Sequence, residues 1–142
     1  MRDVALDAPV EGLDLKGVPD ALHDLMIELH AERDADSMNG ILASARNVMP
    51  NANGTVVVKF SGSVTAKGKD VDRTRLRAIK ARDYMDGTTR ELVESVDFGA
   101  TIALGAALAE DPAAIAELPL CDARSVYYAV AVLRKNWFGP KT

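Results

Sequence analysis

Two helices are predicted in the first third of the chain, because apolar residues recur there at the spacing of one helical face. The first series begins after Pro19 and Asp20 and consists of Leu22, Leu25, Met26 and Leu29. The second series consists of Met38, Ile41, Leu42, Ala45 and Val48, and Asp36 or Ser37 is expected to cap its helix. We therefore expect a helical pair over residues 20–33 and 37–49.

The apolar spacing changes from a helical period to alternation after residue 55. Every second residue is apolar or small from Val56 to Ala66, which is typical of a strand with one buried face. Gly62 interrupts the apolar series and indicates a bulge or a close approach of another backbone. The segment 67–70, Lys-Gly-Lys-Asp, has the composition of a turn. A strand over residues 55–66 is therefore expected to lead into a hairpin.

The return strand of this hairpin is predicted from a second alternation. Arg73, Arg75 and Arg77 alternate with less polar residues. Residues 76–85 also contain good helix formers, so a helix over this segment stays open as an alternative. Pairing favours the strand, because a lone amphipathic strand leaves its backbone donors and acceptors unpaired. The second strand is therefore placed over residues 72–80, and the hairpin should lie on the helices or extend across a dimer.

The last third of the chain is predicted to be helical. Thr88 and Glu91 have the spacing of a capping box for a helix over residues 88–109, which contains small residues that allow a neighbour to approach closely. Two more helices are expected over residues 112–118 and 122–137, the second one capped by Asp122.

These elements together predict one α+β domain over residues 19–142: a helical pair, an amphipathic β-hairpin and C-terminal helices. Residues 1–18 lack a clean period and predict an irregular N-terminal arm. With 142 residues, the chain is long enough to bury a sizeable core.

Composition indicates a cytoplasmic protein. The single cysteine, Cys121, excludes an internal disulfide and favours a reducing compartment. The first residues have no apolar core of signal-peptide length. The most apolar run, residues 98–109, is too short to span a bilayer, so no membrane partner is expected.

Positive charge is concentrated in the middle of this acidic chain. Residues 59–82 hold eight basic and two acidic residues, whereas the chain as a whole has a net charge of −4. On the expected hairpin these side chains form a surface of ammonium, guanidinium and hydroxyl donors, which suits phosphate oxygens. The candidate binding residues are Lys59, Lys67, Lys69, Arg73, Arg75 and Arg77. The alternative is a solvated face that pairs with acidic groups of the same molecule or of a neighbour.

No pattern in the sequence predicts catalysis, a metal site or a cofactor. His23 and His30 are seven residues apart, about 10 Å along a helix, which is too far for one metal ion. Cys121 precedes a predicted helix start that favours a thiolate, but its apolar neighbours indicate a buried, inert thiol. Phosphate-binding glycine motifs are absent. We therefore expect a protein that is not an enzyme.

Residues 54–110 resemble small early proteins of tailed phages. The likeness rests on GTVVVKFSGSVTAKGKD, the basic return strand and the alanine-rich helix after it. It implies a phage-encoded accessory protein that acts on host machinery or on phage nucleic acid, and it carries over no catalytic residue.

The sequence thus predicts a non-enzymatic accessory binding protein whose basic hairpin contacts nucleic-acid phosphates. The alternative is a protein–protein interaction module that uses the same hairpin. Such a module would inhibit a host or defence protein, or form a subunit of a homo-oligomer, with an acidic protein surface or a second copy as its partner.

Overall fold

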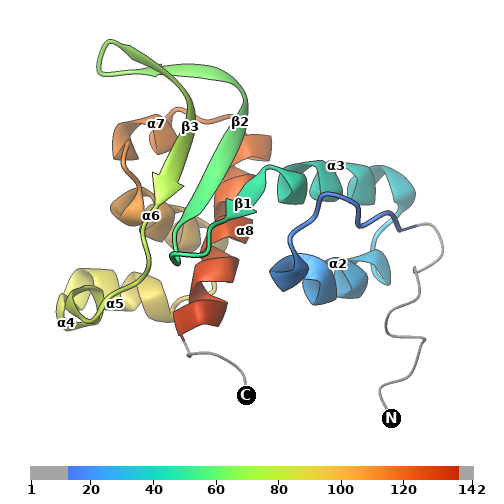
Figure 1. Ribbon diagram of the computed structural model, residues 1–142, viewed down its shortest axis with the longest axis horizontal. Helices are drawn as coiled ribbons and strands as arrows, with labels where there is room; N and C mark the ends of the chain where they lie inside the picture. The colour runs from blue at the N-terminus through green and yellow to red at the C-terminus, as the bar shows by residue number, and fades with distance from the viewer. Residues whose placement is uncertain (1–12, 138–142) are drawn as a thin grey trace.

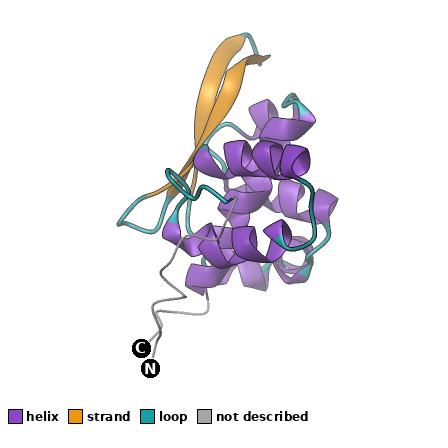
Figure 2. Ribbon diagram, turned by 90° about the vertical axis from the view of Figure 1, so that its right-hand side faces the viewer, coloured by secondary structure: helices purple, strands orange, loops and turns teal. Residues whose placement is uncertain are grey.

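A small antiparallel sheet lies against a layer of helices in the computed structural model, which describes residues 13–137 (Figure 1). The elements in chain order are η1 (Asp20–Leu22), α2 (His23–His30), α3 (Ala35–Arg46), β1 (Val48–Pro50), β2 (Val56–Ala66), β3 (Lys69–Leu76), α4 (Ala81–Met85), α5 (Gly87–Glu94), α6 (Phe98–Leu108), α7 (Pro112–Ala116) and α8 (Leu120–Trp137). Figure 2 shows the helices on one side of the sheet, with the far end of the β2–β3 hairpin projecting past them. The predicted α+β class is confirmed.

Helix α8 is the centre of the core. It packs against η1, α3, β1, β2 and α6, so every layer of the molecule contacts it. Its inner stripe is fully buried and consists of Val126, Ala129, Val130 and Leu133. These four residues belong to the stripe that helical periodicity indicates for this segment. No helix between residues 13 and 137 is long and apolar enough to cross a bilayer.

The sheet has the strand order β1-β2-β3, with both pairs antiparallel. The predicted hairpin is present, and Val56, Val58 and Leu76 are completely buried against the helices, as alternation requires. Strand β1 was not predicted, and the expected helix over 37–49 ends at Arg46 instead. Three residues are too few for alternation to be distinguished from a helical period, and Val48 is buried under either assignment.

The predicted bulge lies in β2, between Lys59 and Val64, where the register against β3 shifts. Open space surrounds Gly62, so the glycine belongs to the bulge and no other backbone approaches it. The amide of Ser61 donates to the Asp122 carboxylate at 3.0 Å, and the Ser61 hydroxyl donates to it at 2.8 Å. The bulge therefore has a buried acceptor on α8 that replaces the missing ladder partner.

This contact corrects the role predicted for Asp122. Helix α8 begins at Leu120, so Asp122 lies inside its first turn and does not cap it. Its side chain is directed to β2, and the residue is only 2% exposed. A long-range hydrogen bond has thus displaced the local capping bond that the sequence favours.

Strand β3 ends earlier than predicted, at Leu76 and not at residue 80. The segment after α6 pairs with its outer edge: Leu76 forms a bridge with Ala109, and the Arg77 amide donates to the Leu108 carbonyl at 3.0 Å. The alternative helix over 76–85 exists only in its second half, as α4. The outer edge of β3 is therefore covered at this end.

Two predicted caps differ from those in the structure. Asp34, and not Asp36 or Ser37, caps α3 by accepting a hydrogen bond from the Ser37 amide at 2.8 Å. The box predicted for Thr88 and Glu91 is not formed, because α5 begins at Gly87 with Asp86 as its N-cap.

The helix predicted over 88–109 is divided into α5 and α6. Asp97 caps α6 by accepting from the Ala100 amide at 3.1 Å, which fixes the new helix start. The half-buried guanidinium of Arg134 in α8 donates to the carbonyls of Leu92 and Ser95 at the end of α5. Both partners satisfy backbone groups that the break leaves open.

We expect Gly105→Ala to lower the free energy of unfolding by about 1–3 kcal/mol, as overpacking does. A Cβ atom at this position would overlap Val126 Cγ1 and lie 3.4 Å from Val130 Cγ2. Valine is stiff at χ1 in a helix, so the clash outweighs the roughly 1 kcal/mol by which alanine favours a helix over glycine. Urea unfolding measures the loss. In the double variant with Val126→Ala the two losses should be clearly less than additive, and strict additivity would contradict the contact.

Asp122→Ala is expected to destabilise the fold by about 1–3 kcal/mol, because the bulge loses a buried side chain that accepts two hydrogen bonds. Asp70→Ala serves as the matched control, since it removes an exposed hydrogen bond from Thr65 in the same hairpin. Thermal and urea unfolding of both variants measure the difference. Equal effects would show that the buried contact does not support the bulge.

Candidate binding surface on the sheet

Three of the predicted binding residues share the face of the sheet that points away from the helices. Lys59 of β2 is the direct cross-strand partner of Arg73, and Val57 is the partner of Arg75. Lys59, Arg73 and Arg75 are exposed, whereas Val58 and Thr74 between them are buried. We use the name outer face for the set Met49, Val57, Lys59, Arg73 and Arg75. For Lys59, Arg73 and Arg75 the two alternations thus fall on one face, whereas the Ser61 hydroxyl expected there donates to Asp122 on the helix side.

The two remaining lysines lie at the hairpin tip. Lys67 and Gly68 form the turn, and both have a positive φ, of 52° and 75°. This backbone conformation suits glycine and strains lysine. The Lys67 side chain is exposed at the tip of the turn. Lys69 comes after the turn and forms an ion pair with Asp111 at 3.3 Å.

The arginines of the outer face have weak internal partners. Arg73 lies 3.5 Å from the carboxylate of Asp72, and Arg75 lies 3.7 Å from that of Glu110. All four side chains are more than half exposed. Such pairs contribute at most about 1 kcal/mol each, so an external anion can replace the internal carboxylates.

Arg77 is separated from the other arginines. It lies beyond the end of β3, and its guanidinium forms a two-pronged pair with Asp83 at 2.6 and 2.7 Å. The Asp83 side chain is only 6% exposed and also accepts a hydrogen bond from the Lys80 amide. The hydrogen bond with Arg77 holds the pKa of Asp83 below its usual value. The expected row of three exposed arginines is therefore wrong for Arg77, which holds α4 against the end of β3.

Acidic groups surround the remaining basic residues. The outer face and the tip carry five basic side chains, Lys59, Lys67, Lys69, Arg73 and Arg75. The acidic groups next to them are Asp70, Asp72, Glu110 and Asp111. The surface is therefore of mixed charge, although the segment 59–82 alone is strongly basic.

Sequence reasoning missed the residues that change this surface. Glu110 and Asp111 come from the segment after α6, and nothing in their local pattern relates them to the hairpin. Met49 lies on the unpredicted strand β1, opposite Val57, and is 37% exposed. The only sequence signal for this strand is the alternation of residues 48–50, which is too short to be recognised.

The histidine and cysteine candidates for catalysis or metal binding do not form a site. His23 Nε2 lies 2.8 Å from the Val18 carbonyl, as expected of a histidine at a helix border. Cys121 is exposed, so the prediction of a buried thiol is wrong. Within residues 13–137 no group of three histidine, cysteine, aspartate or glutamate side chains is placed to hold a metal ion.

Comparison of the chain with protein-family models, with curated proteins and with solved structures gives no match. The function of the chain is therefore inferred from the geometry and charge of its surface.

Asp83→Asn should lower the free energy of unfolding by about 2–4 kcal/mol at pH 7, because it weakens a nearly buried charged pair. The pKa of Asp83 is lowered on folding, so the pair contributes fully above the ordinary value of 3.8 and is lost as the pH falls through the folded-state pKa. The gap between wild type and variant should therefore shrink below about pH 4. Urea unfolding at pH 7, 5 and 3 measures it, with the exposed Asp72→Asn as control. A gap that stays constant with pH would contradict the assignment.

Proposed function

We propose that this protein is a non-enzymatic, cytoplasmic binding protein that docks its outer face on an acidic protein surface. The carrying observation is the grouping of Lys59, Arg73 and Arg75 beside the apolar side chains of Met49 and Val57 on one face. Arginine and methionine are enriched in protein interfaces, where apolar contacts lie inside a polar rim. The phage resemblance suggests that the partner is a host or defence protein, or a second copy of the chain.

The mixed charge of the surface favours a protein over a polyanion. A phosphate backbone presents negative charge along its whole length, so it would meet Asp72 and Glu110 together with the arginines. A protein partner can place basic groups against these carboxylates and acidic groups against Lys59, Arg73 and Arg75. Complementarity of this kind determines which partner is accepted.

Nucleic-acid binding is retained as a second candidate, because Lys59 lies directly opposite Arg73 on an exposed two-stranded ribbon. A ribbon of this kind fits the major groove of duplex DNA. The long pairs of Arg73 and Arg75 are weak enough to be exchanged for phosphates. With three to five cations available, log K should fall with log salt at a slope of about −3 to −4.5.

The test is the variant Arg73→Glu/Arg75→Glu, compared with Lys16→Glu/Arg82→Glu, which changes the net charge equally at exposed positions outside the sheet. Capture from lysate with nuclease treatment, followed by titration of the purified partner, should show binding to wild type and control and a loss of at least about tenfold in the outer-face variant. Sedimentation in the absence of lysate measures whether a second copy is that partner.

Met49→Ser separates the two candidates. It removes an apolar contact that a protein partner would use and that phosphates would not, so it should weaken binding of the captured protein and leave DNA affinity unchanged. Titration of duplex DNA at 50 and 200 mM salt completes the comparison. DNA binding with the slope above, lost in the outer-face variant, would replace the protein proposal by the nucleic-acid one. Equal binding by wild type and outer-face variant in all assays would overturn both.

A further inference from the structure

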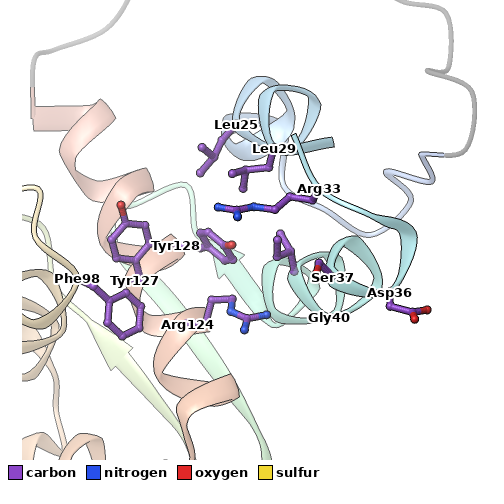
Figure 3. A pocket seen from close by; sticks show the side chains of 11 residues that line it. Leu25, Leu29, Arg33, Asp36, Ser37, Gly40, Phe98, Arg124, Tyr127 and Tyr128 are labelled. Carbon is purple, nitrogen blue, oxygen red and sulfur yellow. The ribbon is translucent and has the colours of Figure 1, made fainter. Parts of the chain in front are cut away.

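A pocket of about 590 Å³ lies between the helical pair and α8, away from the outer face (Figure 3). Its walls come from α2, α3, α6, α8 and the loop that carries Arg33. The polar lining includes Arg33, Ser37 and Arg124, and the aromatic lining is Phe98, Tyr127 and Tyr128. The volume is in the range of sites for small molecules.

Two guanidinium groups reach into this pocket from opposite sides. Figure 3 shows Arg33 entering from the side of the helical pair and Arg124 from α8, with the ring of Tyr128 nearby. Neither arginine forms an ion pair or a hydrogen bond with any residue from 13 to 137. Other arginines with such contacts in this range donate to carboxylates or carbonyls, as Arg77 and Arg134 do. The pocket is thus lined by two guanidinium groups that form no ion pair with a carboxylate among residues 13–137.

The acidic residues nearest to the pocket do not neutralise it. Asp36 lies at the rim, and Figure 3 shows its carboxylate directed away from both guanidinium groups. The Asp34 carboxylate accepts a hydrogen bond from the Ser37 amide as the cap of α3. An anion from solution would therefore find two forked donors available.

Gly40 keeps the space for Arg124 open. A Cβ atom at this position would lie 3.4 Å from Arg124 Nη1, at the near limit of ordinary van der Waals contact. A glycine inside a helix costs up to about 1 kcal/mol relative to alanine. The absence of a side chain at Gly40 leaves this space to the Arg124 guanidinium.

The aromatic wall offers a flat apolar surface beside these charges. Phe98 and Tyr127 are stacked with their ring centroids 5.4 Å apart, and Phe98 is 41% exposed. Burial raises the pKa of Tyr128, so its hydroxyl keeps its proton at neutral pH and can donate. A ligand with a ring and an oxyanion would use both parts of the lining.

The walls are held in place by hydrogen bonds between α3 and α8. The Ser44 hydroxyl donates to the Cys121 carbonyl at 3.1 Å, and the Ser125 hydroxyl donates to the Ser44 carbonyl at 2.9 Å. Because these bonds fix the two helices that carry Gly40 and Arg124, ligand binding needs little further ordering of the backbone.

We propose that this pocket binds a small aromatic oxyanion: a flat ring that bears a phosphate or carboxylate group, of the size of a nucleoside monophosphate. The oxyanion lies between Arg33 and Arg124, and the ring packs on Phe98 and Tyr127. This inference is independent of the proposed docking surface and goes beyond it.

Isothermal titration of the full chain tests the proposal with AMP, GMP, benzoate, adenosine and inorganic phosphate as probes. At least one aromatic anion should bind at least about tenfold more tightly than adenosine or phosphate, which each carry only half of the recognised features. Arg124→Gln should weaken that probe about tenfold or more, because a charge-assisted hydrogen bond is lost. Arg90→Gln, an exposed arginine outside the pocket, is the matched control and should bind as wild type does.

Two further variants in the pocket and one on the outer face exclude a merely structural effect. Gly40→Ala should keep or raise the melting temperature and yet weaken the probe, since it crowds Arg124. Phe98→Ala should weaken the aromatic anion while leaving inorganic phosphate unchanged, whereas Arg73→Glu/Arg75→Glu should leave both unchanged. Failure of every aromatic anion to bind at millimolar concentration, or binding that Arg124→Gln does not alter, would overturn the proposal.

Discussion

The close contact between Gly105 of α6 and Val126 of α8 determines how the rest of the molecule is arranged. A glycine at this position lets the two helices approach until the side chain of Leu76 in β3 also contacts the site, so α6, α8 and the sheet meet there. The chain leaving α6 is thereby placed along the outer edge of β3, where the Glu110 amide donates to the Arg75 carbonyl at 2.9 Å. The positions of Glu110 and Asp111 beside the basic strand are a consequence of this helix packing.

The parts of the fold that depend on local periodicity could be predicted from the sequence. Alternation in residues 56–60 predicts the burial of Val56 and Val58, and the same parity places Lys59 and Arg73 on one exposed face. The parts that were missed depend on contacts between distant residues. Aspartate is a favoured helix-capping residue, yet the Asp122 carboxylate accepts a hydrogen bond from Ser61, which is 61 residues away. The local sequence does not indicate whether the Asp122 carboxylate caps its own helix or bonds to a distant strand.

Arg77 illustrates the same limit on the candidate site. Parity places it on the face of Arg75, and this inference would hold if the strand continued. The strand ends at Leu76, however, and the chain continues into α4, which brings the Arg77 guanidinium to Asp83. Whether a basic residue is available to a partner is therefore decided by carboxylates that the fold brings near, and a charge count along the sequence does not contain this information.

Charge in this protein therefore has to be judged in three dimensions. The segment with the highest density of positive charge in the sequence has acidic neighbours in the fold. Arg73 lies beside Asp72, and Arg75 lies beside Glu110. Arg33 and Arg124 lie in segments of ordinary composition, and the packing of the helical pair on α8 brings them to one pocket. The bonds of Ser44 and Ser125 hold α3 against α8, so the walls of this pocket are fixed by the fold itself. Side chains that no local charge pattern relates to one another are thus brought to one preformed pocket, where an anion would need little further ordering of the backbone to bind.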